Sequence, residues 1–138
     1  MKNIYLNIHK PSLANLKKAK KSLENNNVIA IPTETVYGLA ANAYSDQAVK
    51  KIFKLKKRPK FNPLIIHYNN LKMLKNDATY NKTFLILYKS LCPGPITFIL
   101  HKKKGSKISK EATGNKKTIA VRFPQHNVAR NLLKILNN

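Results

Sequence analysis

Hydroxyl, cationic and imidazole side chains occur in the first half of this sequence, each where an apolar segment ends. Thr33 and Thr35 follow one apolar run, and His67 lies at the end of a second. Between these runs, Lys56 and Arg58 close an amphipathic segment. Hydroxyl and ammonium groups donate hydrogen bonds, and a planar guanidinium binds phosphate or carboxylate oxygens in pairs. This combination predicts a site for an anionic ligand.

Three expected elements position these side chains. Residues 28–31 are all apolar and predict a buried strand, which Pro32 closes. Residues 46–57 carry apolar side chains at helical spacing, and Pro59 stops the expected helix. Residues 64–68 form the next mostly apolar run and predict a second strand. We therefore expect the hydroxyls at a strand end, the cations at a helix end and the histidine at the next strand end.

The rest of the chain also alternates between strand-like and helix-like patterns. We expect strands over residues 3–8, 96–100 and 118–123, and helices over 71–75, 81–91, 127–136 and from Pro11 to Asn25–Asn27. Residues 102–117 are polar and lysine-rich, which predicts a mobile loop. Strands interleaved with helices indicate an α/β layer structure. No internal repeat or linker is visible, so residues 1–138 are expected to form a single domain.

The composition is that of a folded domain without a membrane span. The chain has 138 residues, of which 43% are hydrophobic, enough for a core. No apolar run approaches the roughly 20 residues of a membrane span, and we see no signal peptide. Cys92 is the only cysteine, so an internal disulfide is excluded and a cytoplasmic location is expected. No cluster of cysteine and histidine at zinc-ligand spacing indicates a bound metal.

The net charge of +22 is extreme for a chain of this length. A polyanionic partner, such as RNA or the phosphates of ATP, is one explanation. The other is codon bias, because the excess cation is almost entirely lysine, and lysine, asparagine and isoleucine all have AT-rich codons. The two explanations are compatible, since lysines fixed by codon bias still create a positive field.

Five short motifs follow one another along the chain. They are PTETVYGL at 32–39, K-x-R-P at 56–59, N-P-L-I-x-H at 62–67, PGPIT at 93–97 and AVRFPQH at 120–126. Together they resemble the YrdC-like family of threonylcarbamoyl-AMP synthases, from about Leu13 to the C-terminus. The resemblance implies a twisted, open, mixed sheet with helices on its faces, a topology that periodicity alone does not predict.

The resemblance assigns four residues to ATP. Lys56 and Arg58 match residues that line the phosphates and act in catalysis, and Asn62 and Thr118 match other nucleotide contacts. Lys56, Arg58 and Asn62 also have a purely structural explanation. Cations at a helix C-terminus stabilise its dipole by about 0.3–1 kcal/mol, and asparagine is a common turn residue.

Four further residues are assigned to L-threonine. Thr33, Thr35 and His67 match residues that border its pocket, although the threonines would also suit a turn and the histidine a strand end. Arg122 lies within an apolar strand, where an unpartnered guanidinium is costly. A substrate carboxylate is a suitable partner, and the family places the carboxylate of threonine there.

The resemblance also implies the chemistry. The amine of L-threonine takes up bicarbonate, and the resulting carbamate attacks the α-phosphate of ATP to give threonylcarbamoyl-AMP and pyrophosphate. Mg²⁺ is expected to arrive with ATP, and no other cofactor or resident metal is implied. A partner complex then transfers the threonylcarbamoyl group to tRNA. The protein would act through positioning and charge neutralisation, which agrees with the absence of a nucleophile motif.

One part of the family pattern is absent. The family has a Ser-x-Asn motif just beyond the helix expected at 127–136, and this sequence ends at Asn138. We therefore expect an incomplete domain whose missing part a second polypeptide supplies, which leaves activity of the chain alone open. The alternative is a truncated or split-gene remnant, inactive alone, that retains nucleotide or double-stranded RNA binding. A third interpretation, a stand-alone double-stranded RNA-binding module, is supported by charge but by no motif.

Overall fold

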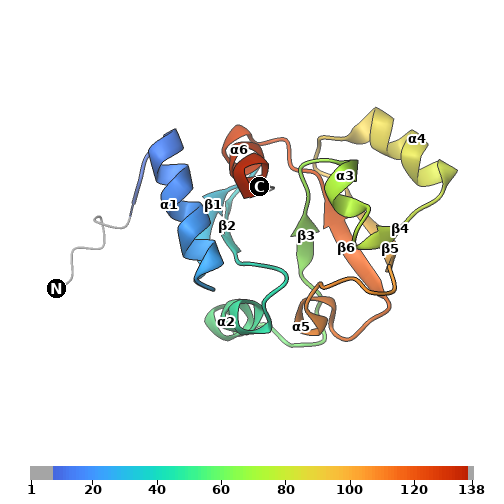
Figure 1. The fold of residues 1–138 in the computed structure, drawn as a ribbon, viewed down its shortest axis with the longest axis horizontal. Helices are drawn as coiled ribbons and strands as arrows, with labels where there is room; N and C mark the ends of the chain where they lie inside the picture. Colours follow the sequence, from blue (N-terminus) through green and yellow to red (C-terminus); the bar gives the residue numbers. More distant parts are fainter. Residues whose placement is uncertain (1–7, 137–138) are drawn as a thin grey trace.

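Helices and strands are interleaved along the chain, as the sequence predicts. A computed structural model describes residues 8–136 (Figure 1). The elements are α1 (Leu13–Glu24), β1 (Ile29–Pro32), β2 (Tyr37–Ala40), α2 (Asp46–Lys56), β3 (Ile65–His67), α3 (Leu71–Leu74), β4 (Ala78–Thr79), α4 (Lys82–Leu91), β5 (Thr97–Lys102), α5 (Lys110–Thr113), β6 (Thr118–Arg122) and α6 (Asn127–Leu136). Within these described residues, no helix is long and apolar enough to cross a bilayer.

A four-stranded mixed sheet forms the larger half of the molecule. Its strand order is β3-β6-β5-β4, with β3 parallel to β6 and β5 antiparallel to both β6 and β4. One face carries the buried core, in which Phe98 of β5 meets Phe84 of α4 at 5.0 Å between ring centroids. The other face is open, since the side chain of Ile99 is 66% exposed. The open mixed sheet implied by the resemblance is thus confirmed.

A smaller hairpin stands apart from this sheet. Strands β1 and β2 pair antiparallel with each other, and α1 and α6 lie beside them (Figure 1). Leu16 and Leu23 of α1 pack with Leu132 of α6 in a second buried cluster. The ammonium of Lys20 also donates to the backbone carbonyl of Ile135 at 3.0 Å. The first and last described helices therefore pack together on the hairpin.

Helix α2 begins and ends almost where the sequence predicts. The Ser45 hydroxyl accepts a hydrogen bond from the N–H of Ala48 at 3.2 Å, which caps the helix N-terminus. Lys57 takes a left-handed conformation with φ of 49°, so the expected helix loses its last residue. Pro59 follows and prevents any continuation. The cations expected at the helix end accordingly lie at a sharp change of direction.

The structure departs from the sequence predictions in several places. Strand β1 includes Pro32, which was expected to close it, and its residues are half-buried or exposed where a buried strand was expected. Strand β2 was not expected, because Gly38 and Ala40 have low strand propensity and pairing with β1 fixes the segment. The expected loop over residues 102–117 is wrong in part. It contains the short helix α5 and a buried side chain at Ile108. Most of the expected strand over residues 3–8 lies outside the described residues, and Ile8 is exposed and in no strand.

Candidate functional site

His67 and Arg122 lie next to each other at the carboxyl ends of two parallel strands. They are register partners between β3 and β6, and Thr97 of β5 is the partner of Arg122 on its other side. Register partners point to the same face of a sheet. The Nε and Nη2 atoms of Arg122 both donate to the Thr97 hydroxyl, at 3.0 and 2.7 Å. These three side chains therefore form one polar row across the sheet.

The turn between β1 and β2 reaches this row through Glu34. A carboxylate oxygen of Glu34 accepts a hydrogen bond from the N–H of Gln125 at 2.6 Å, just beyond β6. Partial burial would raise the pKa of Glu34. Backbone hydrogen bonds, led by that from Gln125, and the charge of Arg122 outweigh it and lower this pKa below its ordinary value. Glu34 thus stays ionised and ties the turn, with Thr33 and Thr35 on either side of it, to the end of β6.

The charge of Arg122 also acts on His67. Burial first, and then the nearby guanidinium, lower the pKa of His67 below its ordinary value, so the imidazole is neutral near pH 7. Thr33 is engaged locally, since its hydroxyl donates to the carbonyl of Val36 at 2.5 Å and accepts from the N–H of Val36 at 3.3 Å. Thr35 is exposed. The row therefore presents a neutral imidazole beside one cation, which has N–H donors that bond to no acceptor among the described residues. This arrangement is suited to the carboxylate of an amino acid.

The residues assigned to ATP lie near the other ends of these strands. Lys56 is the last residue of α2, and Arg58 and Asn62 belong to the connection that leads from this helix to the amino end of β3. The Arg58 guanidinium donates to the carbonyls of Asn62 and Pro63, at 3.1 and 2.9 Å. Arg58 is thus partly committed to holding its own loop, whereas Lys56 is exposed. Among the described residues, Lys56 has no hydrogen bond or ion pair through its ammonium, so this group can move toward a phosphate.

Thr118 connects the two groups because it begins the strand that Arg122 ends. Residues an even number of positions apart on a strand share a face, and four residues span about 13 Å. Ala120 lies between them and pairs with Ile65 on one side and Ile99 on the other. The exposed fractions of these isoleucines are 39% and 66%. The expected threonine and nucleotide contacts on β6 are therefore brought onto one open face, separated by an apolar row.

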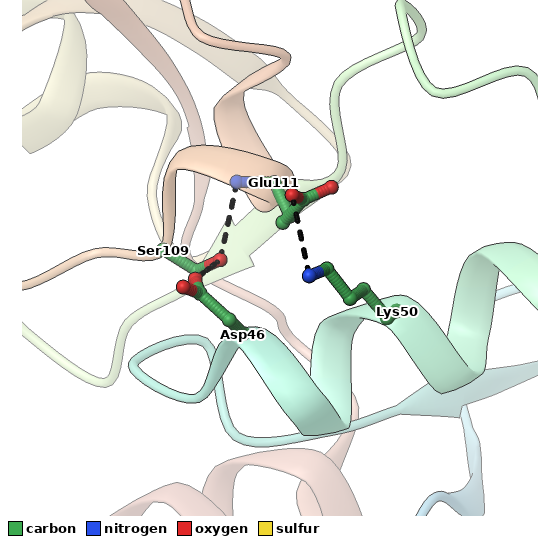
Figure 2. A network of polar contacts seen from close by, with 4 residues as sticks. All are labelled: Asp46, Lys50, Ser109 and Glu111. Atoms are coloured by element: carbon green, nitrogen blue, oxygen red, sulfur yellow. Dashed lines mark hydrogen bonds and ion pairs between the residues drawn. The ribbon is translucent and has the colours of Figure 1, made fainter.

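Asp46 and Glu111 hold α2 against α5 and are not part of the polar row. The Ser109 hydroxyl donates to the carboxylate of Asp46 and accepts from the N–H of Glu111 at 3.2 Å (Figure 2). Glu111 also pairs with Lys50 at 3.7 Å. No group of three histidine, cysteine or acidic side chains that would hold a metal ion occurs among residues 8–136. These carboxylates are used to orient the helix that precedes the Arg58 loop.

Sequence reasoning did not assign Glu34 or Thr97 to the site. Glu34 lies inside the PTETVYGL motif, and Thr97 ends the PGPIT motif, so both were within the segments that carried the resemblance. Their contacts with Gln125 and Arg122 cross 91 and 25 residues of sequence. The pairing of Thr97 with Arg122 appears only in the register of β5 and β6, and the contact of Glu34 with Gln125 appears only in the folded position of the turn between β1 and β2.

Known proteins of one family are similar to this chain in sequence and in fold. The Sua5/YciO/YrdC family model, described as telomere recombination, matches residues 21–138. The threonylcarbamoyl-AMP synthase of Pyrococcus abyssi is 41% identical over 111 residues, which cover 78% of this chain and 32% of the relative. That of Bacillus subtilis is 38% identical, covering 94% and 36%. The chain thus spans about a third of the length of these relatives. The crystal structure of P. abyssi Sua5 complexed with L-threonine aligns with a TM-score of 0.85 at 37% identity, covering 91% of this chain and 36% of that one.

Proposed function

Because this chain belongs to the Sua5/YciO/YrdC family, we propose that it contributes to the synthesis of threonylcarbamoyl-AMP and pyrophosphate from L-threonine, bicarbonate and ATP. The observation that carries this proposal is the polar row of His67, Arg122 and Thr97 on an open sheet face. A solved relative was crystallised with L-threonine, and a guanidinium with unused donors is the group that an amino-acid carboxylate needs.

The carboxylate of L-threonine binds Arg122 in this proposal. The neutral imidazole of His67 accepts a hydrogen bond from the substrate amine or hydroxyl, and Thr33 and Thr35 border the bound threonine from the turn between β1 and β2. The amine nitrogen attacks the carbon of bicarbonate, and loss of water gives a carbamate. A carbamate oxygen then attacks the α-phosphorus of ATP while the bond to the bridging oxygen breaks, so that pyrophosphate leaves.

ATP lies toward the amino ends of β3 and β6 in this proposal. Thr118 and Asn62 contact the nucleotide, and Lys56 and Arg58 neutralise charge on its phosphates, aided by the Mg²⁺ that ATP carries. The Arg58 guanidinium keeps two N–H groups on its own loop and offers the rest to the ligand. These residues accelerate the reaction by positioning and electrostatic stabilisation, with no covalent intermediate on the protein.

RNA is the proposed partner beyond the small substrates. Transfer of the threonylcarbamoyl group to tRNA, by a complex that includes other polypeptides, would follow the adenylation step. The net charge of +22 favours a second candidate function, in which the chain binds nucleotide or double-stranded RNA without adenylation.

Pyrophosphate release tests the proposal. The chain is incubated with ATP and Mg²⁺, with and without L-threonine and bicarbonate, and binding of L-threonine is measured by calorimetry. We expect pyrophosphate only when all the substrates are present, and loss of threonine binding in Arg122→Gln but not in Arg130→Gln, a guanidinium on α6. Nucleotide binding without pyrophosphate would favour the second candidate function. No threonine binding by the parent chain would contradict the site.

A further inference from the structure

An open hollow of about 650 Å³ lies beside the end of β5, the first residue of α5 and the segment that leads into β6. None of its lining residues belongs to the polar row or to the set assigned to ATP. Six of them are lysines, namely Lys102, Lys103, Lys104, Lys110, Lys116 and Lys117. We call this feature the lysine hollow. It falls within the segment that the sequence marks as lysine-rich.

Hydrogen bonds fix the backbone that carries these lysines. The N–H of Lys102 donates to the carbonyl of Lys117 at 2.8 Å, which joins the two sides of the hollow. The N–H of Ser106 closes a turn on the carbonyl of Lys103 at 3.0 Å. The Ser106 hydroxyl then donates to the buried carboxylate of Asp77 at 2.8 Å. The ammonium groups are therefore presented from a braced frame.

Carboxylates near the lysine hollow are already committed elsewhere. Asp77 is 1% exposed and also accepts hydrogen bonds from the hydroxyls of Tyr44 and Tyr68, at 2.6 and 2.9 Å. Glu111 pairs with Lys50, outside the hollow. Among the described residues, none of the six lysines is in an ion pair with a carboxylate. The local positive potential is consequently not cancelled by the protein.

Six ammonium groups on three chain segments match a series of phosphates better than one small anion. Lysine is a hydrated point charge on a flexible stem, which suits phosphate oxygens along a backbone but carries no base-reading geometry. Binding several phosphates releases the counterions that condense on a nucleic acid, and this release drives association. The hollow is also open to solvent, as a backbone lying across the surface requires.

We propose that the lysine hollow binds the phosphate backbone of a nucleic acid, by charge and not by base sequence. This proposal assigns a binding site on the chain to the RNA partner of the proposed function. It rests on that function only for the choice of RNA as the partner. It needs neither ATP nor threonine. The competing explanation is that +22 charges attract nucleic acid to every surface alike.

Two matched triple variants separate these explanations. One replaces Lys104, Lys116 and Lys117 of the lysine hollow by glutamine, and the other replaces three lysines of α1, namely Lys17, Lys18 and Lys21. All six side chains are exposed, and both variants lower the net charge equally. Helix α1 lies on the far side of the molecule from β5 (Figure 1). Anisotropy titrations use labelled RNA and DNA duplexes of one sequence, between about 50 and about 200 mM salt.

The hollow variant should bind both duplexes at least about tenfold more weakly, with a salt slope reduced by about one for each lysine removed. The α1 variant should bind within about twofold of the parent, and a variant with arginine at the three hollow positions should bind like the parent. Equal losses in the two glutamine variants, or no loss in either, would overturn the proposal. So would displacement of the duplex by ATP beyond the effect of its ionic strength. Pyrophosphate release, measured on the same proteins, reports separately on the proposed function.

Discussion

Replacing Arg122 by glutamine removes the charge that we assign to the carboxylate of threonine. The guanidinium has five N–H donors, and the two observed bonds to the Thr97 hydroxyl, at 3.0 and 2.7 Å, use Nε and Nη2. The remaining donors bond to no acceptor among the described residues, and Arg122 lies in the same row as His67. Glutamine keeps a hydrogen-bond donor on a shorter side chain but carries no charge.

A hydrogen bond to a charged group contributes about 1.5–3 kcal/mol. Loss of one such bond should weaken L-threonine binding by about 10- to 150-fold. The folded state should lose less, about 1 kcal/mol, because Thr97 loses a partner at a half-buried position. Binding and unfolding therefore respond to different extents, which identifies a ligand contact as opposed to a packing defect.

Calorimetric titration with L-threonine and urea unfolding measure the two effects in one set of proteins. Thr97→Val serves as the matched control, since it removes the hydroxyl that holds Arg122 but leaves the guanidinium charge. We expect it to weaken threonine binding less than Arg122→Gln does. Binding by Arg122→Gln within twofold of the parent, with the fold intact, would show that the carboxylate lies elsewhere.

Further predictions concern the acidic residues. The pKa of Glu34 is lower in the folded than in the unfolded chain, so its contribution to stability is present above the unfolded pKa and is lost as pH falls through the folded pKa. Glu34→Gln should therefore flatten the acid side of the stability–pH curve, measured by urea unfolding at stepped pH, and an unchanged curve would contradict this. Asp77→Asn should lower the free energy of unfolding, measured in urea, by about 1–3 kcal/mol. The carboxylate accepts from three hydroxyls through its two oxygens, whereas the amide has one oxygen, so at least one hydroxyl loses its acceptor. Asp46→Asn, at an exposed carboxylate, is the control. An equal loss of unfolding free energy in the two variants would contradict a special role for the buried Asp77.

Local signals in the sequence predict elements whose ends are set by neighbouring residues. Helix α2 is an example, because Ser45 and Pro59 define its limits without reference to the rest of the chain. Helix α5 has local caps too, at Ser109 and at Gly114 with φ of 59°, but its four residues lie within a polar segment whose composition indicates a loop. Short elements of this kind have too few residues for a periodic pattern.

The candidate site is less predictable because it depends on register. His67 and Arg122 are separated by most of the chain's second half, and parallel pairing of β3 with β6 makes them neighbours. The motifs identify both residues, but no pattern in the sequence states that Thr97 is the partner of Arg122 or that Glu34 reaches Gln125. The family resemblance predicts which residues belong to the site, and the strand register shows that His67, Arg122 and Thr97 are neighbours.

Polar and buried apolar side chains alternate along β6, and this alternation also affects how accurately the strands pair. Arg122, Ala120 and Thr118 point to the open face, while Val121 and Ile119 are 0% and 1% exposed in the core. A slip of one residue between β5 and β6 would exchange the two sets and bury a guanidinium among aromatic rings. An uncompensated buried charge costs several kcal/mol, comparable to the whole stability of a small domain. The residue that binds the substrate in our proposal would thereby also exclude the misaligned sheet during folding.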